Sequence, residues 1–214
     1  MKRKNPQKAK ALSGIEAGGE TQLRLMYTRH MKELKLTGNY LKNKKKKSEF
    51  EQLAYKNIGS FFSEAEKAVQ LLAGPQFQER LSYAKKTGEL CHGSYNYHNI
   101  IFSNGNTAVT NFDKYKNECQ ISDLYQFMRK ILEKYDWDIQ TAYKMMEEYD
   151  KIKPVSDTER ALLAALFAFP EKFWKVMNYY FNSNKAWIPP KTKEKLEKVV
   201  QQNEKRQKFL ETLL

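Results

Sequence analysis

The stretch "CHGSYNYHNII", residues 91–101, holds the side chains of this sequence that are best suited to chemistry. His92 and a glycine open it, polar and aromatic residues follow, and Asn99 leads directly into apolar residues. This order is typical of a catalytic loop that enters a β-strand. His92 itself fits a packed or backbone-bonded histidine better than a metal ligand. Cys91 with His98 offers a nucleophile and a base, although no third group that would orient the histidine is identifiable.

A hairpin is expected directly after this loop. The runs "NIIF" and "TAVTNF" are apolar or alternating, and Asn104-Gly105 stands between them. Both residues of an Asn-Gly pair accept positive φ, so this pair between apolar runs is a strong hairpin signal. Because side chains alternate along a strand, Asp113 is expected to share a face with Asn111.

Helical periodicity dominates on both sides of the hairpin. Apolar residues recur at three- and four-residue spacing in three segments before it and in about five segments after Asp123. The aromatic residues of "WKVMNYYF", 174–181, follow this spacing and fit a core better than a ligand-binding cluster. The order of elements predicts a mainly α fold (α+β) around a small hairpin. Two capping boxes and one terminating glycine mark helix ends: Ser48 with Glu51, Ser156 with Glu159, and Gly88.

The composition limits the class of protein. Hydrophobic residues make up 41% and aromatic residues 13% of the 214 residues, which indicates a globular chain rather than a disordered one. No window approaches 18 apolar residues and the N-terminus lacks the apolar core of a signal peptide, so no membrane insertion is expected. Cys91 and Cys119 are too few for a disulfide framework, which favours a reducing, cytoplasmic setting.

The formal net charge of +13 is concentrated near the N-terminus. Residues 1–56 hold 15 Lys and Arg against 5 Asp and Glu, a net charge of +10. This asymmetry is compatible with binding to nucleic acid or to an anionic surface. No aromatic stacking platform is interleaved with the lysines, however, so nucleic acid is the weaker interpretation. We expect residues 1–20 to form a flexible basic tail and the lysines of "LKNKKKKSEF" to be a solvated helix end.

Three segments carry a resemblance to a known family: "RHMKELKLTGNYLKNKKKKSEFEQLAY", "CHGSYNYHNIIF" and "TNFDKYKNECQISDLYQFMRKILEKYDWD". Over about residues 21–214 the sequence resembles the spore coat CotS-like proteins. These are kinase-fold relatives of aminoglycoside and choline phosphotransferases, associated with endospore-forming bacteria. The resemblance implies the C-terminal lobe of a protein-kinase-like fold, in which helices surround a small hairpin that carries the catalytic loop.

The resemblance also implies a role for each polar side chain around the hairpin. In this superfamily the loop supplies an aspartate base and, five residues later, a metal-binding asparagine, and the strand after it ends in a metal-binding aspartate. These positions hold Ser94, Asn99 and Asn111. His92 stands in the family's His-Gly-Asp pattern. Asp123 takes the position of the aspartate that anchors the backbone of the catalytic loop.

Two of these positions depart from the family pattern. A serine hydroxyl cannot replace an aspartate base at neutral pH, so Ser94 is expected to be inactive. Asn111 offers a neutral carbonyl where a carboxylate would hold Mg²⁺. Asp113 is the nearest substitute, and Asn99 alone proves little because loop asparagines commonly cap backbone groups. We therefore read Asn99, Asn111 and Asp113 as remnant metal positions, and we expect no cofactor.

A complete kinase fold also has a five-stranded N-terminal lobe with a glycine-rich phosphate loop and an ATP-binding lysine. The residues before His92 show helical periodicity, and "LSGIEAGGET" lacks the Gly-x-Gly-x-x-Gly spacing. We expect residues 21–214 to be a C-terminal lobe without an N-terminal lobe, in a natural short protein or in a fragment.

Three functions follow from these observations. The favoured one is a non-catalytic kinase-like lobe that acts as a structural or interaction protein of the spore coat. It would bind other coat proteins, or a second copy, through the face that an N-terminal lobe covers in the family, near Tyr95, Tyr97 and Phe112. The alternative is a fragment of an ATP-dependent small-molecule phosphotransferase that uses Mg-ATP. A basic nucleic-acid-binding module is the weakest.

Overall fold

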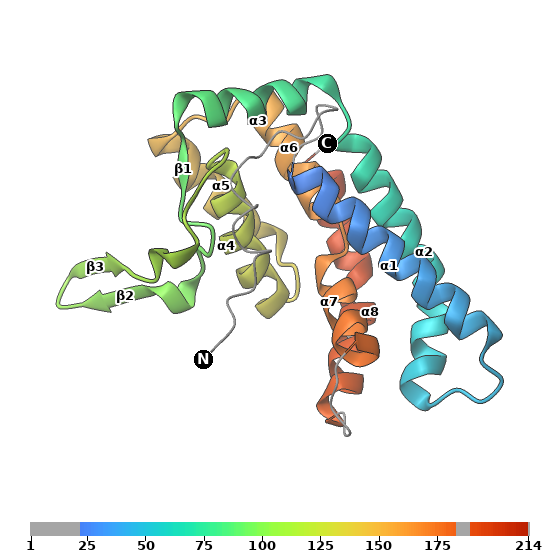
Figure 1. The fold of residues 1–214 in the computed structure, drawn as a ribbon. Helices are drawn as coiled ribbons and strands as arrows, with labels where there is room; N and C mark the ends of the chain where they lie inside the picture. The colour runs from blue at the N-terminus through green and yellow to red at the C-terminus, as the bar shows by residue number, and fades with distance from the viewer. Residues whose placement is uncertain (1–21, 183–188, 214) are drawn as a thin grey trace, which may run out of the picture.

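The structure is a computed structural model that describes residues 22–182 and 189–213, so the predicted tail of residues 1–20 lies outside the described residues. Well over half of the described residues are helical, as predicted (Figure 1). In chain order the helices are α1 (Gln22–Asn43), α2 (Glu49–Leu71), α3 (Pro75–Thr87), α4 (Ile121–Lys134), α5 (Ile139–Ile152), α6 (Asp157–Ala168), α7 (Glu171–Asn182) and α8 (Lys191–Glu211).

Local signals in the sequence set several of these helix ends. The Ser48 hydroxyl accepts a hydrogen bond from the Glu51 amide, and the Glu51 carboxylate accepts one from the Ser48 amide at 2.8 Å. Ser156 and Glu159 form the same reciprocal pair at the start of α6. Both capping boxes satisfy amides that a helix start leaves without partners. Gly88 ends α3 at φ 75°, where a side chain would be strained.

The predicted hairpin is present. Strands β2 (Ile100–Ser103) and β3 (Asn106–Val109) pair antiparallel, with Ile100 opposite Val109. Asn104 and Gly105 turn the chain at φ 49° and 77°. In Figure 1 the hairpin projects away from the helices. It therefore has helices next to its base only.

A second small sheet closes the loop that precedes the hairpin. Strand β1 (Leu90–Cys91) pairs antiparallel with β4 (Lys116–Asn117). Neither β4 nor this pairing was predicted from the sequence. Single 3₁₀ turns cover Tyr97–Asn99 and Phe112–Lys114. Within residues 22–89 no strand occurs, in agreement with the helical periodicity of that part of the chain.

The core forms where the helices cross. Helix α2 contacts α1, α6 and α8, while α4 contacts α5 and α6. Aromatic side chains of α7 pack onto α2: the rings of Phe61 and Phe173 stack at 3.9 Å between centroids, and those of Phe50 and Tyr180 at 3.8 Å. The aromatic residues of segment 174–181 thus contribute to the core, as their spacing indicated.

Candidate functional site

The loop before the hairpin is held by Asp123, in the first turn of α4. One carboxylate oxygen of Asp123 accepts a hydrogen bond from the His92 amide at 2.6 Å, and the other accepts one from the Gly93 amide at 3.0 Å. Bonds from amides to a charged carboxylate are stronger than neutral ones. The carboxylate therefore fixes the backbone of the loop from one side.

Both ring nitrogens of His92 form hydrogen bonds to the backbone. Its Nε2 lies 2.8 Å from the carbonyl oxygen of Thr110, and its Nδ1 lies 3.2 Å from the amide nitrogen of Ser94. A carbonyl can only accept and an amide can only donate, so Nε2 carries the proton and Nδ1 is the acceptor. Neither nitrogen is left for a metal ion, and His92 acts as a bridge between the loop and the end of β3.

The backbone of Gly93 packs closely against the backbone of Lys114, in the segment after the hairpin. Its φ is 73°, and a Cβ atom built on it would lie 1.9 Å from the carbonyl oxygen of Lys114. Any larger residue would have to move the segment after the hairpin. The identity of the residue at this position is therefore set by backbone packing.

Asn99 and Asn111 are joined side chain to side chain. The Asn99 amide nitrogen donates to the Ser94 carbonyl at 2.8 Å, and the Asn99 carbonyl accepts from the Asn111 amide nitrogen at 2.8 Å. The backbone carbonyl of Ser94 can only accept, which fixes the orientation of the Asn99 amide and, through it, that of Asn111. The structure thus brings three of the predicted site residues into one chain of hydrogen bonds.

Asp113 does not lie where the strand pattern placed it. Strand β3 ends at Val109, Asn111 has a left-handed backbone (φ 64°), and Asp113 sits in the following 3₁₀ turn. The prediction that Asp113 shares a strand face with Asn111 is wrong, because period-two alternation stops where the strand stops. Asp113 is exposed, and the described residues give it no hydrogen bond or ion pair.

The family model described as "Spore coat putative kinase YutH" matches residues 21–213. The chain belongs to this family. The match confirms the resemblance to spore coat proteins with a kinase-like fold.

One solved structure shows the fold of this spore coat kinase family in a larger protein. An aminoglycoside phosphotransferase from Alicyclobacillus acidocaldarius superposes with a TM-score of 0.83 at 19% sequence identity, covering 91% of this chain and 58% of that one. At this identity the likeness shows the fold alone, and it confirms the kinase-like assignment. The chain spans 58% of the length of that phosphotransferase. No curated protein matches the chain.

The side chains at the family's metal positions do not fit Mg²⁺. Asn111 is a neutral amide where the resemblance implies a carboxylate, and the Asn99 oxygen already accepts the hydrogen bond from Asn111. Hard cations prefer charged oxygen ligands, and a second amide nitrogen points toward the oxygen that would have to bind the ion. In the part of the chain that the structure describes, no group of three or more His, Cys, Asp or Glu side chains could hold a metal ion.

Ser94 contributes its backbone rather than its hydroxyl. Its amide donates to His92, and its carbonyl accepts from Asn96 and Asn99. An unassisted hydroxyl holds its proton too tightly to act as a base at neutral pH. The resemblance assigns Ser94 to the position of the family base, which a serine hydroxyl cannot replace without assistance.

The second possibility from the sequence, a Cys91–His98 pair, is not formed. Cys91 is buried, and its thiol donates to the Glu118 carbonyl at 3.1 Å. Burial raises the pKa of this thiol well above its usual range, which disfavours the nucleophilic thiolate. His98 is exposed, with its ring against Tyr97.

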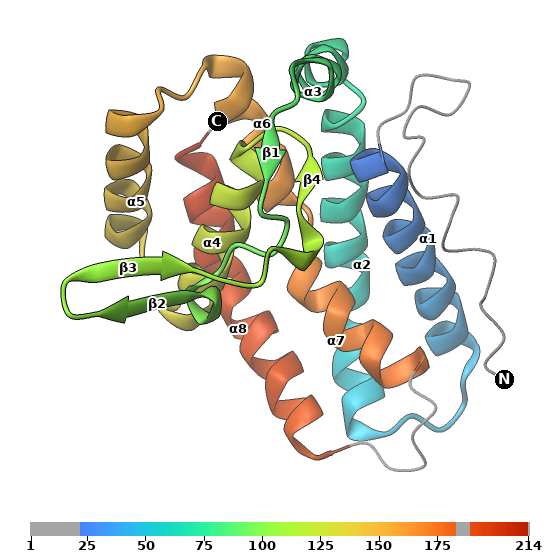
Figure 2. The ribbon, with the colours of Figure 1, turned by 60° about the vertical axis from the view of Figure 1, so that its left-hand side comes forward.

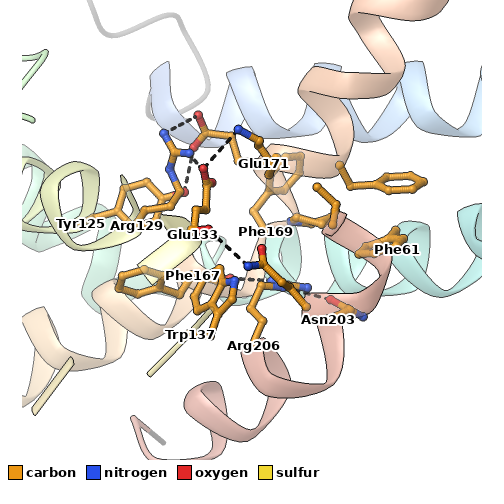
Figure 3. Close-up of a pocket in the computed structure, with 15 residues that line it drawn as sticks. Phe61, Tyr125, Arg129, Glu133, Trp137, Phe167, Phe169, Glu171, Asn203 and Arg206 are labelled. Carbon is orange, nitrogen blue, oxygen red and sulfur yellow. Dashed lines mark hydrogen bonds and ion pairs between the residues drawn. The ribbon is translucent and has the colours of Figure 1, made fainter. Parts of the chain in front are cut away.

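A small cavity lies away from the hairpin, between α4, α7 and α8 (Figure 3). Its volume is about 30 Å³, which suits one or two water molecules and excludes a nucleotide. None of the predicted site residues lines it.

Charged side chains meet beside this cavity (Figure 3). Arg129 donates to Glu133 at 2.6 Å and lies 3.4 Å from Glu171, which also accepts from the Tyr125 hydroxyl at 2.8 Å. Burial alone would raise the pKa of Glu171, but the charges of Arg129 and Lys175 outweigh burial and lower this pKa to about 2. Sequence reasoning missed this cluster because charged residues of an amphipathic helix are normally assigned to the solvent face.

Arg206 extends the same buried network to α2. It is buried on α8, pairs with Glu64, and donates to the carbonyl of Phe167 at 2.8 Å. These bonds link α8 to α2 and to the end of α6. The network around the cavity therefore holds helices together.

Proposed function

We propose that this chain is a non-catalytic kinase-like lobe that serves in the spore coat as a structural or interaction protein. The hydrogen bond from Asn111 to Asn99 is the observation that carries this proposal. It joins the two positions that hold the metal ion in active members of the superfamily. Ser94, at the position of the base, supports the same conclusion.

The surface around the hairpin supports a role in binding other proteins. The described residues expose several large apolar side chains here, and exposed apolar patches usually recruit a partner. Phe112 is 54% exposed, in line with the prediction from the sequence, while Tyr95 and Tyr97 are half-buried. We call the exposed set the hairpin region; it comprises Leu90, Ile101, Phe102, Phe112 and Tyr115. Its partner would be another coat protein or a second copy of this chain.

Calorimetric titration with Mg-ATP, alongside a phosphate-release assay, tests the non-catalytic part. We expect no saturable binding by the wild-type chain. The double variant Ser94→Asp/Asn111→Asp restores both carboxylates, but it should still fail to bind nucleotide, because the sequence shows no glycine-rich loop to hold the phosphates. Micromolar binding or turnover by the wild-type chain would overturn the proposal.

The partial coverage of the phosphotransferase favours testing a second function in the same experiment, that of a phosphotransferase fragment. Since the chain spans 58% of that protein's length, it could be the part of an enzyme whose other lobe is a separate segment. Adding an N-terminal lobe as a separate chain distinguishes the two. Nucleotide binding that appears only after this addition would establish the phosphotransferase fragment.

Sedimentation velocity tests the interaction part. We expect concentration-dependent association of the wild-type chain that is lost in Phe102→Ser/Phe112→Ser. Ile152→Ser is the matched control, because Ile152 is 89% exposed on α5, outside the hairpin region. Equal loss in the control, or a wild-type monomer at every concentration, would contradict self-association through the hairpin region.

A further inference from the structure

Two basic segments that are distant in the sequence meet at one end of the molecule. The Ser48 hydroxyl, at the start of α2, lies 3.0 Å from the Tyr180 hydroxyl near the end of α7. Lys193, in the first turn of α8, forms an ion pair with Glu49. The turn between α1 and α2 therefore lies beside the start of α8, as both views show (Figures 1 and 2).

This arrangement gathers positive charge that the sequence distributes over two places. Residues 42–51 and 191–195 together hold eight lysines and three glutamates, a net charge of +5. Glu51 pairs with Lys44, and Glu49 pairs with Lys193. Within the described part of the chain, Lys45 and Lys46 are exposed and make no ion pair. We call residues 42–48 with Lys191, Lys193 and Lys195 the lysine end.

Exposed aromatic rings flank these lysines, although none is interleaved with them in the sequence. Tyr40 and Tyr55 are 52% and 44% exposed. The ammonium groups of Lys44 and Lys47 lie 5.6 Å and 4.9 Å from the respective ring centroids. Leu36, one turn before Tyr40 on the same face of α1, is 68% exposed.

The shape of the lysine end distinguishes between polyanions. The turn joins two long helices and so presents a convex tip to solvent (Figure 1). Proteins that bind single-stranded nucleic acid track its backbone with a charged groove. A convex tip of lysines instead fits a flat anionic surface, where clustered lysines attract acidic headgroups and tyrosine rings favour the headgroup level.

We propose that the lysine end docks this protein peripherally on a bilayer rich in anionic phospholipid. The bilayer is contacted and not crossed, because no described helix is long and apolar enough to span it. Each lysine near an anionic surface strengthens binding roughly fivefold. Tyr40 and Leu36 would lie at the boundary between headgroups and acyl chains. This proposal is independent of the chemistry at the hairpin.

Co-sedimentation with vesicles tests the proposal. The full chain is mixed with vesicles of phosphatidylcholine alone or with one-third phosphatidylglycerol, at low and high salt. We expect binding only to the anionic vesicles, weakened by salt. Lys45→Gln/Lys46→Gln should reduce the affinity by about 10–30-fold. The matched control, Lys85→Gln/Lys86→Gln, removes two exposed lysines at the end of α3 and should change it little.

A spectroscopic probe supplies a second readout. In Tyr40→Trp, brominated anionic lipids should quench the added fluorescence relative to the wild-type chain. Equal losses in the two double-lysine variants would reduce the effect to net charge and overturn the proposal. Binding to phosphatidylcholine alone would do so as well. Tighter binding to single-stranded DNA than to anionic vesicles at the same salt, dependent on Lys45 and Lys46, would assign the surface to nucleic acid instead.

Discussion

The side-chain amide of Asn111 donates a hydrogen bond to the side-chain carbonyl of Asn99 at 2.8 Å, and Asn99 donates in turn to the backbone of Ser94. The resemblance to the spore coat family assigns these three residues to two metal positions and a base position. By that assignment, hydrogen bonds between neutral groups replace the attraction between carboxylates and a cation. These bonds connect the loop to the end of the hairpin.

Asn111→Asp tests this replacement. The new carboxylate faces the Asn99 oxygen, so the variant should lose about 1–2 kcal/mol of unfolding free energy in EDTA. Millimolar Mg²⁺ should recover part of the lost unfolding free energy, because the Asp carboxylate and the Asn99 oxygen can both bind the ion. Asn111→Gly keeps the positive φ but supplies no ligand, and its melting temperature should not respond to Mg²⁺. A Mg²⁺-dependent melting temperature in the wild-type chain would show that Asn99 and Asn111 can bind the ion, and would contradict this prediction.

Gly93→Ala should be strongly destabilising, and Gly105→Ala only mildly so. Both glycines have similar positive φ, 73° and 77°, so the conformational strain of about 1 kcal/mol is common to both variants. Only at Gly93 would the added Cβ meet the Lys114 carbonyl at 1.9 Å; at Gly105 nothing lies within 4 Å. Urea unfolding should separate the variants by about 2 kcal/mol or more. Equal losses of unfolding free energy would mean that the segment at Lys114 moves aside without an energetic penalty, which would contradict the prediction.

The sequence predicted the features that depend on local signals. The capping box at Ser48 and the Asn104-Gly105 turn each involve residues within four positions of one another, and both are present. The strand β4 was missed because two residues carry no periodicity and their partners in β1 lie 25 and 27 positions upstream. Asp113 was misplaced because the left-handed backbone of Asn111 ends the alternation.

The sequence predicted which residues form the candidate site, but it did not predict the hydrogen bonds between them. The resemblance pointed to Asn99 and Asn111, but a hydrogen bond between two side chains depends on how the loop and hairpin pack together. Arg129 and Arg206 were missed for a related reason: periodicity assigns arginines to solvent, whereas both are buried and pair with Glu171 and Glu64. Burial of a charge is a tertiary property.

Asp123→Asn should destabilise the loop by about 2–3 kcal/mol. The carboxylate accepts two backbone hydrogen bonds, and an asparagine would direct an amide nitrogen at one of the two donors. Asp157→Asn is the control, since it also removes a carboxylate from the first turn of a helix but is exposed. Chemical denaturation of both variants gives the comparison. A loss below about 0.5 kcal/mol for Asp123→Asn would contradict the anchoring role.

His30 makes stability depend on pH. It is buried on α1, with its ring stacked on Trp174 at 3.4 Å between centroids, and its Nδ1 has no hydrogen-bond partner in the described structure. Burial lowers the pKa of His30 to about 4; the charge of Glu33 opposes this effect and that of Arg29 adds to it. The folded protein therefore keeps the ring neutral where the unfolded chain, with a pKa near 6.5, already binds a proton.

The sign follows from this difference in proton binding. Below pH 6.5 the unfolded state binds more protons, so the free energy of unfolding falls as pH falls toward 4. Between pH 7 and pH 5 the wild-type chain should lose about 2 kcal/mol through this histidine. His30→Phe keeps a stacked ring without a titrating group and should lose little over the same interval. His98→Gln, which removes an exposed histidine, should retain the wild-type dependence. Urea unfolding at pH 7, 6 and 5 measures all three chains, and parallel pH profiles for wild type and His30→Phe would show that His30 is not the responsible group.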